Sequence, residues 1–185
     1  MMKTFFILSL PLSRTAWLAN FLTYENSFCF HEGLLHVPSP HHLDYLFERT
    51  HKPIVGNSDC GNVLFLDEIY DVFPDSKFVI IERPYRDVIS SMHQMGERFC
   101  DDQYVRKAQR LLDTAKTYFN PLVVPFHQLN HENCRRIWQH CVGTAFDSLR
   151  WQMLDGINVQ VDPVKKLDQI DSSHTNISML MEGLH

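Results

Sequence analysis

The sequence predicts an α/β domain in three layers, in which helices cover both faces of a mainly parallel sheet. Apolar runs of strand length alternate along the chain with segments whose apolar residues recur at helical spacing. The run at 77–82, KFVIIE, is apolar and β-branched between its charged ends, as expected of a strand buried on both faces. In such a sheet ligands bind beyond the carboxyl ends of the strands, so the residues that follow each strand are the first candidates for a site.

The first strand is expected over residues 4–10, where an apolar run ends at Pro11. An amphipathic helix is expected over residues 16–24, because Trp17 and Leu18 are followed by further apolar residues one turn later. The same stretch is also similar to a secretory signal peptide, since a lysine precedes the apolar run and small residues follow it. Pro11 and Arg14 interrupt the run, and we therefore expect a retained first strand.

The later elements follow from the same two patterns. Strands are expected at 27–30, 53–57, 77–82, 122–126 and 157–161, and helices from about residue 40, at 62–73, after Pro84, and at 101–118, 130–141 and 146–154. The 185 residues are enough for one domain with a substantial core and short for two. We expect a single domain over residues 1–163 and a polar tail at 164–185, peripheral or partly flexible.

The composition excludes several classes of protein. Hydrophobic residues make up 44% and charged residues 21% of the chain, as in ordinary globular proteins. A formal net charge of −5 disfavours general nucleic-acid binding, and no apolar run approaches the ~20 residues that span a bilayer. The five cysteines are odd in number, scattered and without a C-x-x-C pair, which predicts reduced thiols in a cytoplasmic protein.

Several histidines lie close together in the first third of the sequence. They are His31, His36, His41, His42 and His51. The segment contains neither an H-E-x-x-H motif nor a tight Cys/His pairing with the spacing of a zinc site, so we expect no metal centre.

The turn after the first strand reads PLSRTAW and leads directly into the expected helix. Unpaired N–H groups and the positive end of the helix dipole make such a turn a natural phosphate site. Ser13 and Thr15 offer hydroxyl donors there, and Arg14 offers a cation. The turn lacks the glycines and the lysine of a Walker A motif, and a plain strand–turn–helix without a ligand is an equally consistent interpretation.

A second turn of interest lies in FVIIERPYRDVISSM. The strand carries Arg83 to its end, Pro84 turns the chain, and the next helix carries Ser90 and Ser91. An arginine at a strand end and a serine eight residues later can converge on one phosphate. The alternative is that Arg83 pairs with a neighbouring acid on the surface.

Together the two turns resemble the sulfotransferase family, enzymes that take a sulfuryl group from 3′-phosphoadenosine-5′-phosphosulfate (PAPS). The first loop of that family reads roughly P-[KR]-S-G-T-[TS]-x-L, and residues 11–18 read PLSRTAWL. The second reads roughly R-[DN]-P-[RK]-D-V-x-x-S after a P-[DN]-[AS]-K turn, and its counterparts are PDSK at 74–77 and RPYRDVISS at 83–91. The segment LVVPFHQLNHENCRRIWQHC is similar to a later strand and helix of the family, so the resemblance spans residues 4–155.

The resemblance implies a P-loop-like fold, PAPS as the cofactor and no metal. The implied cofactor-binding residues are Leu12, Ser13, Arg14, Thr15 and Ala16 for the 5′-phosphosulfate, and Arg83 and Ser91 for the 3′-phosphate. A general base must remove the acceptor proton, and the candidates at neighbouring strand ends are Glu32 and His31, followed by Asp59.

Two residues depart from the family pattern. The expected lysine or arginine is Leu12, and the expected glycine is Arg14, whose guanidinium could restore the charge or block the site. The predicted function is sulfuryl transfer to an unidentified hydroxyl or amine of a small molecule or biopolymer. A divergent nucleotide or small-molecule kinase, and a degenerate member that binds a nucleotide or a protein partner without turnover, are the alternatives.

Overall fold

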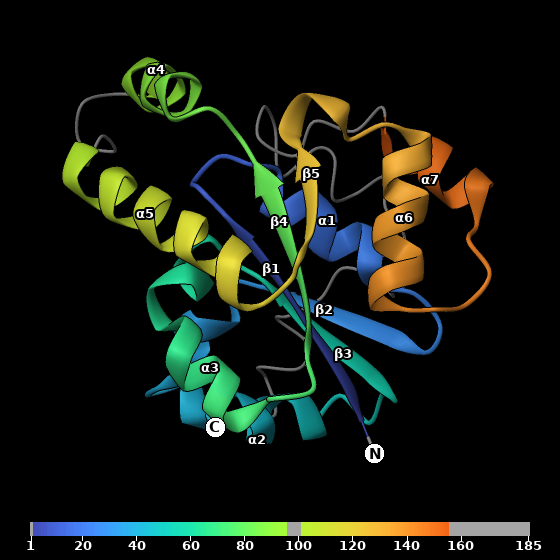
Figure 1. Cartoon of the computed structure of the whole chain (residues 1–185). Coiled ribbons are helices and arrows are strands. Elements are labelled where there is room, and N and C mark those ends of the chain that lie inside the picture. Colours follow the sequence, from blue (N-terminus) through green and yellow to red (C-terminus); the bar gives the residue numbers. More distant parts are fainter. Residues whose placement is uncertain (1, 96–100, 156–185) are drawn as a thin grey trace.

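A computed structural model describes residues 2–95 and 101–155 of the chain. In this part five strands form one sheet in the order β2-β3-β1-β4-β5, and every neighbouring pair is parallel (Figure 1). The strands are β1 (Lys3–Ser9), β2 (Ser27–His31), β3 (Ile54–Ser58), β4 (Lys77–Glu82) and β5 (Leu122–Pro125). The segment that is similar to a leader peptide is thus the central strand of the sheet.

Helices cover both faces of this sheet (Figure 1). They are α1 (Thr15–Leu22), α2 (Leu43–Glu48), α3 (Leu66–Val72), α4 (Tyr85–Met95), α5 (Asp102–Tyr118), α6 (His131–Cys141) and α7 (Ser148–Asp155). Helices α1, α6 and α7 lie on one face, and α2 to α5 lie on the other. The predicted three-layer α/β architecture with a parallel sheet is therefore confirmed. None of the described helices is long and apolar enough to cross a membrane.

The two cores follow from the alternation of side chains along β1. Phe5 and Ile7 point to the face of α1, α6 and α7, whereas Phe6 and Leu8 point to the opposite face. All four side chains are fully buried, which accounts for the uninterrupted apolar run in the sequence.

The predicted helix at 62–73 is two elements. A 3₁₀ segment occupies Cys60–Phe65, and only Leu66–Val72 is α-helical. Asn62 explains the difference, because its buried side chain donates to the carbonyl oxygens of Ile7 and Asn57, both at 3.1 Å. The expected strand at 157–161 and the tail at 164–185 lie outside the described residues.

A buried amide network fixes the carboxyl edge of the sheet. Asn57 on β3 accepts from the N–H of Gly33, which follows β2, at 2.9 Å, and donates to the side-chain oxygen of Asn62 at 2.7 Å. Both asparagines are fully buried, and a buried amide left without partners costs about 1–3 kcal/mol. The network therefore holds the chain after β2 against β3 and β1, where the candidate site lies.

Candidate functional site

The first loop follows β1 and has an unusual backbone. Leu12 has φ 59° and Arg14 has φ 62°, both in the left-handed region, which costs roughly 1–2 kcal/mol for a residue with a Cβ. Arg14 is the N-cap of α1, which begins at Thr15. Successive residues that alternate into this conformation can turn their N–H groups toward one point and make an anion-binding concavity. The loop backbone therefore has the character of an anion site.

The two side chains that depart from the family pattern lie in different surroundings. Leu12 packs against the apolar cluster on the face of α2 to α5. The guanidinium of Arg14 stacks on Trp17, 4.4 Å from the ring centroid. Burial lowers the pKa of Arg14, and the nearby Asp155 acts in the opposite direction. Arg14 thus lies along α1, beside the end of α7.

Arg83, at the end of β4, connects the two predicted turns. Its Nη1 donates to the carbonyl oxygen of Leu12, and its Nη2 donates to Oγ of Ser91 at 2.7 Å. The guanidinium carbon lies 4.5 Å from the centroid of the Phe126 ring. Burial lowers the pKa of Arg83, against the influence of Asp87. Segments 71 residues apart therefore meet at Arg83.

The surface-pairing alternative for Arg83 does not describe its contacts. The neighbouring carboxylate, Glu82, pairs instead with Lys116 at 2.6 Å. Ser91 contacts Arg83, whereas Ser90 is exposed, so Ser91 is the serine of this pair that lies beside the guanidinium. Nε of Arg83 is buried and has no hydrogen-bond partner among the described residues, whereas Nη1 and Nη2 each use one of their two N–H groups in the contacts above.

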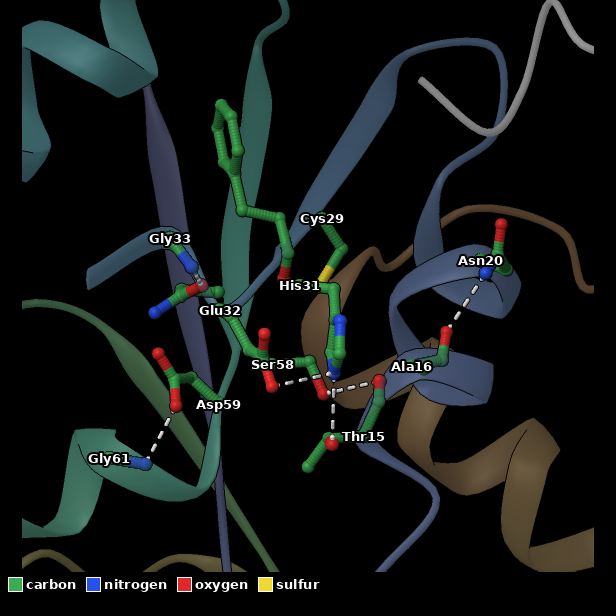
Figure 2. Close-up of polar contacts among 12 residues, drawn as sticks. Thr15, Ala16, Asn20, Cys29, His31, Glu32, Gly33, Ser58, Asp59 and Gly61 are labelled. Atoms are coloured by element: carbon green, nitrogen blue, oxygen red, sulfur yellow. Dashed lines mark hydrogen bonds and ion pairs between the residues drawn. The ribbon is translucent and has the colours of Figure 1, made fainter. Parts of the chain in front are cut away.

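Thr15 joins the first turn of α1 to the ends of β2 and β3 (Figure 2). Nε2 of His31 lies 3.3 Å from Oγ1 of Thr15, and Figure 2 shows the imidazole directed at this hydroxyl. Oγ of Ser58 donates to the Thr15 carbonyl oxygen at 2.9 Å. These contacts hold the helix end of the loop.

The three candidate bases lie together on this side of the loop (Figure 2). Nε2 of His31 is 3.8 Å from Oε1 of Glu32, and Oδ1 of Asp59 accepts from the N–H of Gly61 at 2.7 Å. Burial lowers the pKa of His31, although Glu32 and Asp59 oppose this, and burial raises the pKa of Asp59. The lowered pKa favours the neutral imidazole of His31, which can accept a proton.

Three further residues shape the site and were not singled out from the sequence. Ser58 holds Thr15, Asn57 holds the turn after β2, and Phe126 lies under Arg83. The polar residues at the end of β3 were a usable signal, because they follow a strand at the ligand edge. Phe126 also follows a strand at this edge, but its apolar side chain gave no sign of a ligand contact.

The clustered histidines do not gather around one point. His31 contacts Thr15, whereas Nδ1 of His42 lies 2.9 Å from Oγ of Ser39. Within residues 2–95 and 101–155, no group of three or more His, Cys, Asp or Glu side chains is placed to hold a metal ion.

Asp59→Asn is expected to stabilise the folded chain at neutral pH. The folded-state pKa of Asp59 lies above its unfolded value because burial disfavours the carboxylate, so the charge is a cost wherever both states are ionised. That cost disappears as the pH falls below the pKa of an aspartate in the unfolded chain, about 4. The stability gained by Asp59→Asn should disappear over the same pH range. Urea unfolding at pH 7 and pH 3.5 measures the difference, with the exposed Asp75→Asn as control. An equal effect of the two variants at both pH values would contradict the prediction.

The comparison with known protein families gives one match. A family model described as a sulfotransferase domain matches residues 32–166, which is most of the chain. The matched residues include β3, β4 with the segment 83–91, β5 and α6, and they begin after the loop at 11–16. No curated protein matches the chain significantly.

Proposed function

The chain belongs to the sulfotransferase domain family, and from this premise we propose that it binds PAPS and transfers the sulfuryl group to a hydroxyl or amine acceptor. In this reaction a bond forms between sulfur and the acceptor atom, and the bond between sulfur and the bridging phosphate oxygen breaks. Adenosine 3′,5′-bisphosphate leaves, and the acceptor proton passes to a base of the protein.

The meeting of the two turns at Arg83 is the observation that carries the proposal. One guanidinium reaches both the first loop, at Leu12, and the helix after β4, at Ser91. A cofactor with phosphates at its 3′ and 5′ positions needs two anion sites that are close together but on different segments. The first loop and the Arg83–Ser91 pair are such sites.

The residues present fit a 3′-phosphate. Nη1 and Nη2 of Arg83 each have a second N–H besides the one given to Leu12 or Ser91, and the hydroxyl of Ser91, which accepts from Arg83, retains its own hydrogen for donation. Charge-assisted bonds of this kind are about twice as strong as neutral ones. The loop supplies N–H groups and the hydroxyl of Thr15 for the 5′ end, whereas Ser13 is fully buried with its hydroxyl directed at the Pro11 carbonyl oxygen.

The base is assigned to the group around His31. Burial lowers the pKa of His31 and so favours its neutral form, and His31 and Glu32 are only partly covered, with 29% and 48% of their side chains exposed. Asp59 is only 5% exposed and is bonded to Gly61. These differences favour His31 and Glu32 over Asp59 as groups that an acceptor reaches.

One observation favours a second candidate, a nucleotide-binding protein without turnover. Leu12 packs against an apolar cluster and Arg14 stacks on Trp17, so neither supplies a cation at the position where the family carries one. Without that cation, stabilisation of the charge that develops on the bridging oxygen is weaker. A chain without this cation would still bind the nucleotide but would not catalyse the transfer.

Calorimetric titration with adenosine 3′,5′-bisphosphate, beside ATP with magnesium, tests the proposal. Tight binding of the bisphosphate and weak binding of ATP are expected, since only the first ligand carries a 3′-phosphate. Release of bisphosphate from PAPS in the presence of a panel of alcohols, phenols and amines then separates the transferase from the binding protein. Binding of ATP alone would favour a kinase, and binding of neither nucleotide would refute the proposal.

We also propose a cytoplasmic location. The described cysteines, Cys29, Cys60, Cys134 and Cys141, are free thiols, which suits a reducing compartment. Fractionation of expressing cells tests this, and recovery from a secretory compartment would contradict it.

A further inference from the structure

The first loop keeps a left-handed conformation at a leucine, and Arg83 is the side chain that bonds to this residue's carbonyl oxygen. Glycine adopts this conformation without steric cost, but residues 11–16 contain no glycine. A contact from outside the loop must therefore offset the cost at Leu12. Arg83 is well suited to this, because Ser91 and the ring of Phe126 fix its own position.

The two ends of the loop are held by different parts of the molecule. The helix end, at Thr15, is held by Ser58 and contacts His31. At the strand end, the contact of the Ser13 hydroxyl within the described part of the chain is with the Pro11 carbonyl oxygen, at a long 3.4 Å. Arg83 is therefore the main polar tether that the structure shows at the strand end.

We propose that Arg83 is a positioning residue for the first loop, in addition to the phosphate contact that the proposed function gives it. It stabilises the left-handed conformation of Leu12. Arg83, which belongs to the proposed 3′-phosphate site, thereby shapes the loop that would bind the 5′ end of the ligand. The inference rests on the proposed function only for the ligand, because the contact between Arg83 and Leu12 exists in the chain itself. Arg83→Ala should then weaken binding of a ligand that has no 3′-phosphate.

A double-mutant cycle on stability tests the contact without any ligand. Glycine at position 12 adopts the left-handed conformation freely, so Arg83→Ala should shift the urea midpoint less in a Leu12→Gly background than in the parent chain. Arg14→Gly is the matched control, because Arg14 is also left-handed but no hydrogen bond to Arg83 is found there. The effects of Arg83→Ala and Arg14→Gly should add. Additive effects for Leu12→Gly as well would overturn the inference.

Titration with adenosine 5′-phosphosulfate, which lacks the 3′-phosphate, tests the consequence for binding. Arg83→Ala should raise its Kd about tenfold, the equivalent of one charge-assisted hydrogen bond, and Leu12→Gly should restore part of the loss. The exposed Arg86→Ala should leave the Kd unchanged. An unchanged Kd in Arg83→Ala would overturn the inference. If the parent chain binds neither this ligand nor the bisphosphate, the proposed function fails and the stability cycle alone decides the role of Arg83.

Discussion

Gly56→Ala is expected to lower the free energy of unfolding by about 3 kcal/mol, at the upper end of the usual cost of overpacking a core. A Cβ at this position of β3 would lie 2.2 Å from Cε2 of Phe5, well inside van der Waals contact. Phe5 is fully buried, and its Cα pairs with that of Gly56 across β1 and β3. Because the ring is buried in the core, relieving the clash requires a shift of its core neighbours or of strands β1 and β3. Urea unfolding measures the loss.

Trimming the ring provides the internal check on this prediction. In a Phe5→Leu background, Gly56→Ala should cost much less, because the methyl group then meets a smaller and more adaptable side chain. Gly61→Ala is a milder comparison, since its Cβ would meet Oδ1 of Asp59 at 3.1 Å rather than an aromatic ring. Equal costs of Gly56→Ala with and without Phe5 would show that the clash is not the cause.

The fold could be predicted from the sequence because the spacing of apolar residues within each segment indicates whether it is a strand or a helix and which side is buried. The strand at 77–82 has the predicted bounds, since a β-branched run buried on both faces has few alternatives. The helix at 62–73 was only partly predicted, because the side chain of Asn62 bonds to β1, 55 residues away. No local pattern contains that contact, and it converts the first turns into a 3₁₀ segment.

The sequence indicated candidate residues that the structure brings together, but it did not indicate their geometry. The two turns could be recognised, and Arg83 and Ser91 do meet. The left-handed backbone at Leu12 and Arg14 had no local signal, because propensity assigns both residues to right-handed conformations. The carbonyl oxygen of Leu12 is bonded by Arg83, 71 residues away, whereas the stacking of Arg14 on Trp17 is a contact within one helical turn.

Arg83→Ala is expected to weaken binding of adenosine 3′,5′-bisphosphate about hundredfold. Charge-assisted hydrogen bonds contribute about 1.5–3 kcal/mol each, and Arg83 can give a 3′-phosphate more than one of them. Ser91→Ala removes one hydroxyl donor and should cost about tenfold. Calorimetric titration measures both losses against the parent chain.

The segment itself supplies a control for each of these variants. Arg86 and Ser90 are exposed neighbours of the same residue types, and they carry the same change in charge or volume when replaced by alanine. If the bisphosphate were held by the general positive charge of the segment, Arg86→Ala would lose as much affinity as Arg83→Ala. If any hydroxyl on α4 served, Ser90→Ala would match Ser91→Ala. A loss confined to Arg83 and Ser91 requires a ligand seated between β4 and the first loop, because these are the side chains that the structure joins there. Such a result would separate the cofactor site from surface attraction in a chain that carries a net negative charge.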